Sequence, residues 1–114
     1  MSSILTTRGE NNLHYSFDEL LKDLEIGREI EFEYHMQQCA IVNSNGKWFF
    51  CIDSKSEELC NFEKKDVLIH KVKMLKVDGD NLESIIDHNL YSQGTLYILW
   101  GKAGLQRNWN CIKG

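Results

Sequence analysis

The residues best suited to chemistry lie in the run from Glu29 to Met36, where charged or polar side chains alternate with apolar ones. Residues two apart on a β-strand point to the same side of the sheet. One side of such a strand carries Glu29, Glu31, Glu33 and His35. A histidine beside carboxylates can bind zinc, but carboxylates that follow one another along a strand more often form a solvated edge. We therefore expect no metal at this group.

The four cysteines are the next candidates for chemistry. They are Cys39, Cys51, Cys60 and Cys111. No two of them are separated by two residues, so the usual zinc and redox patterns are absent. A cysteine–histidine nucleophile stays open for each, although no surrounding motif would activate one. An even count permits disulfides, but the hairpin described below places Cys39 and Cys51 on opposite faces of the sheet, and we expect no structural disulfide.

Other catalytic patterns are weak. His88 follows Asp87, but neighbours on a helix point in different directions, so the pair does not predict an acid–base dyad. Phosphate-binding, dinucleotide-binding, serine-hydrolase and metalloprotease motifs are absent from the sequence. We therefore expect a protein that is not an enzyme, with no catalytic residues and no cofactor.

The charged run is positioned by a predicted meander of strands over residues 29–53. Asn45-Gly46 lies between two apolar runs and predicts a tight hairpin, because a type I′ turn needs positive φ at both central residues. With these two residues central, residues whose numbers sum to 91 face each other. Ile41 then faces Phe50 on one side of the sheet, and Val42 faces Phe49 on the other.

This register gives the sheet two unlike faces. If the connection after Tyr34 is also an even-length turn, Ile30 and Phe32 share the side of Ile41, which becomes the core face. The opposite face then combines the three glutamates and His35 with Val42 and Phe49. A later element could cover that face. If none does, it is an acidic and aromatic surface suited to a protein partner.

The remaining elements follow from local signals. Ser16 and Glu19 have the spacing of a capping box and predict a helix over residues 16–26, ended by Gly27. We expect an exposed loop at 54–58, a helix over 62–73, a short helix through 85–90 and a strand at 95–100. The predicted fold is α+β, with the N-terminal helix packed on a small antiparallel sheet (meander 29–53 plus strand about 95–100) and two further short helices. Residues 1–100 form one domain, and 101–114 form a tail.

Charge and composition restrict the partners. The chain carries a net charge of −4, which argues against general binding to nucleic acid. No stretch is long and apolar enough for a membrane span, and the N-terminus lacks the pattern of a secretory signal, so we expect a cytoplasmic protein without membrane contact. Lysines gather between residues 64 and 76, where they suit the wet side of a helix or an anionic ligand.

Three segments resemble small uncharacterised proteins of low-GC Gram-positive bacteria and of their phages and mobile elements. They are Phe17-Asp18-Glu19-Leu20-Leu21, Leu24 to Tyr34, and Asn45-Gly46-Lys47-Trp48-Phe49-Phe50. The resemblance covers roughly residues 16–90. Acidic single-domain proteins of such elements include anti-CRISPR proteins, immunity proteins and antitoxins, and the resemblance implies a function of that anti-defence or immunity type.

The expected function is a non-enzymatic inhibitor that binds a protein partner, such as a host defence nuclease. The expected contact residues are Glu29, Glu31, Glu33, His35, Val42 and Phe49. One alternative is an immunity protein or antitoxin that binds a cognate toxin. Another is a nucleotide binder or sponge, with ligand contacts at an oligomer interface such as that of a homodimer. Its contact residues would be Lys64, Lys65, Lys71 and Lys73.

Overall fold

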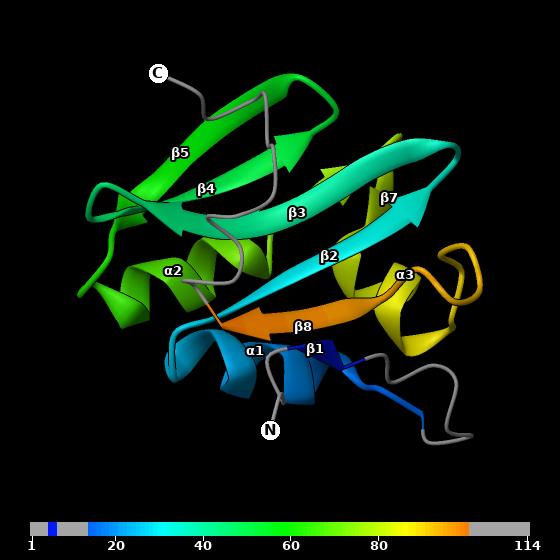
Figure 1. The fold of residues 1–114 in the computed structure, drawn as a ribbon, viewed down its shortest axis with the longest axis horizontal. Coiled ribbons are helices and arrows are strands. Elements are labelled where there is room, and N and C mark those ends of the chain that lie inside the picture. The colour runs from blue at the N-terminus through cyan, green and yellow to red at the C-terminus, as the bar shows by residue number, and fades with distance from the viewer. Residues whose placement is uncertain (1–4, 7–13, 101–114) are drawn as a thin grey trace.

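The computed structural model describes residues 5–6 and 14–100, which form an α+β fold (Figure 1). An antiparallel sheet of six strands has the order β1-β8-β2-β3-β4-β5. The strands are β1 (Leu5–Thr6), β2 (Arg28–Tyr34), β3 (Gln37–Ser44), β4 (Lys47–Ile52), β5 (Lys55–Asn61) and β8 (Tyr97–Trp100). The helices are α1 (Phe17–Glu25), α2 (Lys65–Val72) and α3 (Leu82–Asp87), and β6 (Lys76–Val77) pairs with β7 (Asp80–Asn81) in a separate hairpin.

The predicted N-terminal helix is confirmed as α1, and so is its capping box. The Glu19 N–H donates to Ser16 Oγ (3.1 Å), and the Ser16 N–H donates to Glu19 Oε1 (3.2 Å). These bonds satisfy N–H groups that the first helical turn leaves without partners. A third N–H, from Phe17, donates to Asp87 Oδ1 at 2.7 Å, which joins the start of α1 to the end of α3. Asp87 therefore caps a distant helix.

The predicted strand register is confirmed. Ile41 pairs with Phe50 and Val42 with Phe49 around the Asn45-Gly46 turn, where both residues have positive φ. The connection between β2 and β3 is also two residues long, and it pairs Ile30 with Ile41. The even-length turn therefore places the apolar residues of β2 on the core face, as the alternation in the sequence indicates.

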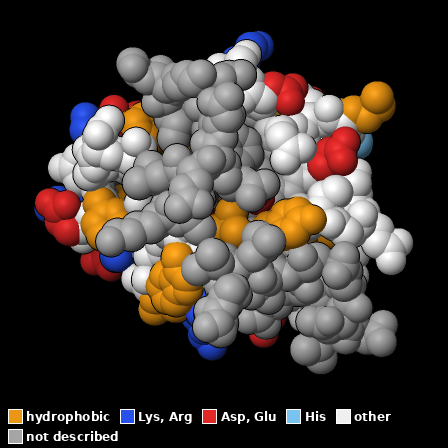
Figure 2. Space-filling model, in the orientation of Figure 1, with side chains coloured by type: hydrophobic (Ala, Val, Ile, Leu, Met, Phe, Trp, Pro, Cys, Tyr) orange, Lys and Arg blue, Asp and Glu red, His pale blue; other side chains and the backbone are white. Residues whose placement is uncertain are grey.

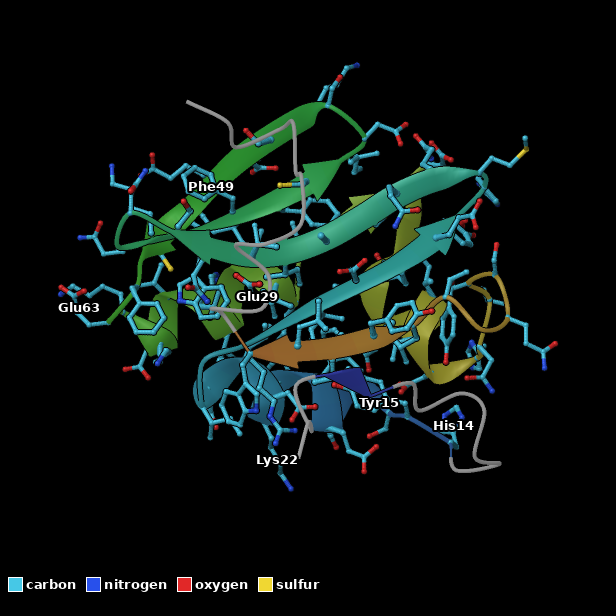
Figure 3. All side chains as sticks on the ribbon, viewed as in Figure 1. His14, Tyr15, Lys22, Glu29, Phe49 and Glu63 are labelled. Carbon is cyan, nitrogen blue, oxygen red and sulfur yellow. The ribbon has the colours of Figure 1, made fainter. Side chains whose placement is uncertain are left out.

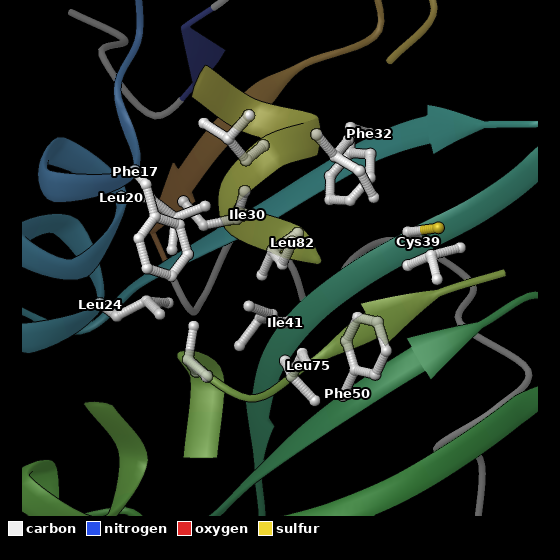
Figure 4. Close-up of a cluster of buried hydrophobic side chains, with 14 of the residues drawn as sticks. Phe17, Leu20, Leu24, Ile30, Phe32, Cys39, Ile41, Phe50, Leu75 and Leu82 are labelled. Atoms are coloured by element: carbon white, nitrogen blue, oxygen red, sulfur yellow. The ribbon is translucent and has the colours of Figure 1, made fainter. Parts of the chain in front are cut away.

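The main core lies between this face and the three helices (Figure 4). Phe17, Leu20 and Leu24 of α1 pack toward Ile30 and Phe32 of β2 and neighbouring strand residues. Trp48 is fully buried, its indole N–H donates to the Phe62 carbonyl oxygen (3.2 Å), and its ring stacks on the Phe62 ring. Burial of large side chains on this face holds the sheet and helices in one unit.

Three element predictions need correction. The short third helix is predicted to reach Leu90, but α3 ends at Asp87. Residues 54–58 are not simply a loop, because Lys55–Asn61 form the edge strand β5. All side chains from Lys55 to Glu58 are exposed, so this part of the strand has no buried face. Its sequence therefore lacks the alternation of apolar and polar residues that would have indicated a strand. The second helix begins at Lys65 and ends at Val72, which is shorter than the predicted 62–73. The predicted tail, 101–114, lies outside the described residues. Within residues 5–6 and 14–100, no helix is long and apolar enough to cross a membrane.

Candidate functional site

The sequence leaves open whether the predicted binding face is covered, and the structure shows that three of its six predicted contact residues are buried. Figure 3 shows Glu29 on β2 and Phe49 on β4. Glu29 is 1% exposed, Glu31 2% and Val42 2%. Val42 belongs to a small second cluster of buried side chains, and the half-buried Phe49 packs against it. Side chains this inaccessible cannot contact a partner in the folded state, so Glu29, Glu31 and Val42 are not surface contacts.

Glu29 also differs chemically from a surface carboxylate. Burial raises the pKa of Glu29 to about 8, and the charge of Glu31 adds to the increase. The hydrogen bond that Glu29 Oε2 accepts from the Asn43 N–H (2.9 Å) acts in the opposite direction. Desolvation disfavours the charged form of a carboxyl group, and here it outweighs the hydrogen bond. Glu29 is therefore predominantly a neutral acid at pH 7 and adds little negative charge to this face.

The other three predicted contact residues remain accessible. Glu33 and Phe49 are half-buried, and His35 is exposed at the turn between β2 and β3. His35 Nδ1 lies 2.8 Å from Asp78 Oδ2, and its ring stacks on the Tyr34 ring with centroids 3.9 Å apart. The structure thus separates His35 from the buried glutamates and places it beside a turn 43 residues further along the chain.

His35 is part of a cluster of three hairpin turns, which we name the turn end. It comprises His35 and Met36 (β2–β3), Asp53 and Ser54 (β4–β5), and Asp78 and Gly79 (β6–β7). Gln37 Nε2 donates to Asp78 Oδ2 at 2.9 Å, and the Gln38 N–H donates to Asp53 Oδ1 at 2.9 Å. The Tyr34 hydroxyl donates to Asp80 Oδ2 at 2.5 Å. These bonds join the tip of β2–β3 to both neighbouring turns.

Backbone strain is concentrated in the turn end. Of the six described non-glycine residues with positive φ, four lie there: His35, Met36, Asp53 and Asp78. Aspartate tolerates this conformation because its short side chain can bond locally, but histidine and methionine tolerate it less well. The β2–β3 turn has φ values of 53° at His35 and 64° at Met36, where Asn-Gly is the favoured pair. Strain of this kind tends to accumulate at functional sites.

The turn end presents an apolar tip beside acidic groups. Met36 is 88% exposed, which is the largest value among the exposed large hydrophobic residues described. In Figure 2 an apolar side chain projects from the β2–β3 turn, with acidic side chains beside it. Asp53 and Asp78 are exposed and Asp80 is half-buried. The hydrogen bond to Asp80 raises the pKa of Tyr34 to about 12, so the tyrosine stays neutral and its hydroxyl remains the donor of this bond.

The cysteines do not form a nucleophilic site in the described structure. Cys39 and Cys60 are free thiols, whereas Cys51 is disulfide-bonded, so the expectation of no structural disulfide is wrong for this residue. Spacing along the chain does not decide which cysteines meet in space. Burial raises the pKa of Cys39 to about 12, which keeps its thiol protonated and unreactive. Cys111 lies outside the described residues.

One of the four lysines expected for a nucleotide, Lys65, makes contacts within the fold. Lys65 Nζ donates to the Glu25 carbonyl oxygen (3.1 Å) and lies 4.7 Å from the centre of the Phe62 ring. This lysine therefore joins α2 to the end of α1.

Within residues 5–6 and 14–100, no group of three or more histidines, cysteines or acids could hold a metal ion.

Comparisons with protein-family models, curated proteins and solved structures find no match to this chain. Of the six predicted contact residues, only His35 belongs to the turn end. The sequence carried one signal for the turn end. The alternation of polar and apolar residues stops at Met36, and a second apolar run begins at Cys39, which marks a short turn between them. Nothing local indicated that Asp78 would lie beside it.

Proposed function

We propose that the protein is a non-enzymatic inhibitor that binds a protein partner through the turn end. The observation that carries this proposal is the exposure of Met36 on a strained but well-braced turn. An exposed methionine is an adaptable apolar anchor, and anchors of this kind supply much of the energy of an interface. A turn that served stability alone would favour Asn-Gly at these two positions.

The charges around Met36 indicate the chemistry of the partner. Asp53, Asp78 and Asp80 form an acidic rim, and Glu33 lies on the strand that leads to the turn. Such a rim steers a basic surface into contact and repels a phosphate backbone. A nuclease has a basic substrate surface, so a host defence nuclease fits this rim. The specific form of this proposal is an anti-CRISPR-like role in the cytoplasm.

An immunity protein or antitoxin is the second candidate, since a toxin with a basic surface would meet the same rim and anchor. The two candidates differ in the partner. A toxin gene beside the gene for this protein would favour the second, and capture of a defence nuclease would favour the first.

The partner can be captured from the turn end directly. A photo-crosslinking amino acid at position 36, expressed in the native host, should yield one stoichiometric adduct that mass spectrometry identifies. Ile26 is a matched control, because it is also exposed (58%) but precedes β2 at the end opposite the turn. The same adduct from both positions, or none from position 36, would contradict the proposal. The purified complex should weaken as salt is raised, because exposed charges are screened.

A further inference from the structure

A cleft lies on the helix side of the sheet along β4 and β5, and one end of it reaches the β4–β5 turn. One cavity of about 440 Å³ lies between the edge of the sheet and the segment that follows α2. Its floor is the buried apolar set Phe50, Leu59 and Leu75. The residues around that floor are Glu57, His70, Lys71, Met74 and Lys76. The volume falls within the range of small-molecule sites, about 300–1,000 Å³.

The cleft continues along the sheet edge. A second cavity of about 460 Å³ shares Phe50, Glu57 and Lys76 with the first. It extends past Ile52 to Lys55 and the β4–β5 turn. An elongated molecule could therefore lie along β4 and β5 across both cavities.

Positive charge gathers at this cleft in a chain whose net charge is −4. Lys71 and Lys76 line the first cavity and Lys55 the second, against the acids Glu57 and Asp53. Among the described residues, the ion pairs are Arg28–Asp23, His35–Asp78 and Lys47–Glu58. None of the cleft lysines is therefore neutralised by a carboxylate within the described part of the chain.

We infer that this cleft binds a small amphipathic carboxylate, such as a medium-chain aliphatic acid. The apolar body packs on Phe50, Leu59 and Leu75, and the carboxylate lies between Lys71 and Lys76. Burial of the ligand's alkyl chain on the apolar floor contributes binding free energy, and the lysines fix the orientation of the ligand by attracting its carboxylate. Glu57 disfavours a polyanion, which separates this ligand class from nucleic acid. The inference does not depend on the proposed protein partner.

Calorimetric titration with decanoate, below the concentration at which it forms micelles, tests the site. We expect saturable 1:1 binding to the full chain. Lys71→Glu and Lys76→Glu should each weaken binding roughly three- to tenfold, because each replaces an attraction by a repulsion at a partly exposed site. Glu57→Gln should strengthen binding. Lys73→Glu is the matched control, since Lys73 lies at the end of the same helix but does not line either cavity, and it should change affinity less than twofold.

Four results would overturn the inference. One is the absence of saturable decanoate binding. Another is an equal loss of affinity in the Lys71, Lys76 and Lys73 variants, which would indicate an effect of overall charge. The third is equal binding of decyltrimethylammonium, which has the same chain and the opposite charge. Binding of an acidic peptide in place of decanoate would assign the cleft to a protein segment and would also overturn it.

Discussion

Replacement of Glu29 by glutamine tests the conclusion that this carboxyl group is buried and largely neutral at pH 7. The pKa of Glu29 is raised from 4.5 to about 8, so the folded state binds its proton more tightly than the unfolded state. The unfolding free energy that depends on this proton is present in full below pH 4.5 and is lost as the pH rises through 8. At about 1.4 kcal/mol per pH unit, the loss between these pH values is on the order of 3 to 5 kcal/mol.

Glu29→Gln removes this dependence. The amide is neutral at every pH, and its oxygen can still accept the Asn43 N–H that Glu29 Oε2 accepts now. The variant should match the wild type within about 1 kcal/mol at pH 5 and exceed its unfolding free energy by about 2 to 3 kcal/mol at pH 7. Urea denaturation at pH 5, 6, 7 and 8, followed by tryptophan fluorescence, to which the buried Trp48 contributes, measures the unfolding free energy of both proteins.

Glu33→Gln is the matched control, because Glu33 lies four residues further along the same strand and is only half-buried. The unfolding free energy of the Glu33→Gln variant should fall as the pH rises, in parallel with that of the wild type. Two results would contradict a buried, neutral Glu29. One is wild-type stability that stays level from pH 5 to 8, and the other is a Glu29→Gln variant that loses stability as steeply as the wild type does.

Three further substitutions test the fold and the turn end. Met36→Gly should raise the unfolding free energy by about 1 kcal/mol, because glycine adopts positive φ without strain. Chemical denaturation at fixed pH measures this gain, and a loss of stability would show that the β2–β3 turn is not strained at this position. Ser16→Ala should lower stability by about 1 kcal/mol through loss of the capping box, and an unchanged thermal midpoint would show that the cap contributes nothing. Trp48→Phe should lower the unfolding free energy by about 1 to 3 kcal/mol, since it leaves a cavity and removes the hydrogen bond to the Phe62 carbonyl. Thermal unfolding followed by circular dichroism measures this loss, and an unchanged midpoint would contradict it.

The features that the sequence predicted correctly are those encoded within a few residues. The capping box of Ser16 and Glu19 and the Asn45-Gly46 turn each depend on adjacent side chains and on allowed φ values. Once the turn is known, the register of β3 and β4 follows from counting. The core face of β2 follows in turn from its alternation.

The features that it missed depend on contacts between distant segments or on solvent exposure. Strand β5 has little buried surface, so it has no hydrophobic period to detect. Alternation places Glu29 and Glu31 on the face opposite the core, but it does not tell whether that face meets water. The turn end requires Asp78 to lie beside His35, and that approach is set by how the β6–β7 hairpin packs.

The affinity of the captured partner for Met36→Gly, compared with the wild type, tests the proposed function most directly. The substitution removes the exposed anchor while preserving or raising stability, so a loss of binding cannot be attributed to unfolding. We expect affinity to fall at least about tenfold in calorimetric titration, as for the loss of a central interface residue. A partner that binds Met36→Gly within twofold of the wild type would contradict the assignment of the turn end as the binding surface.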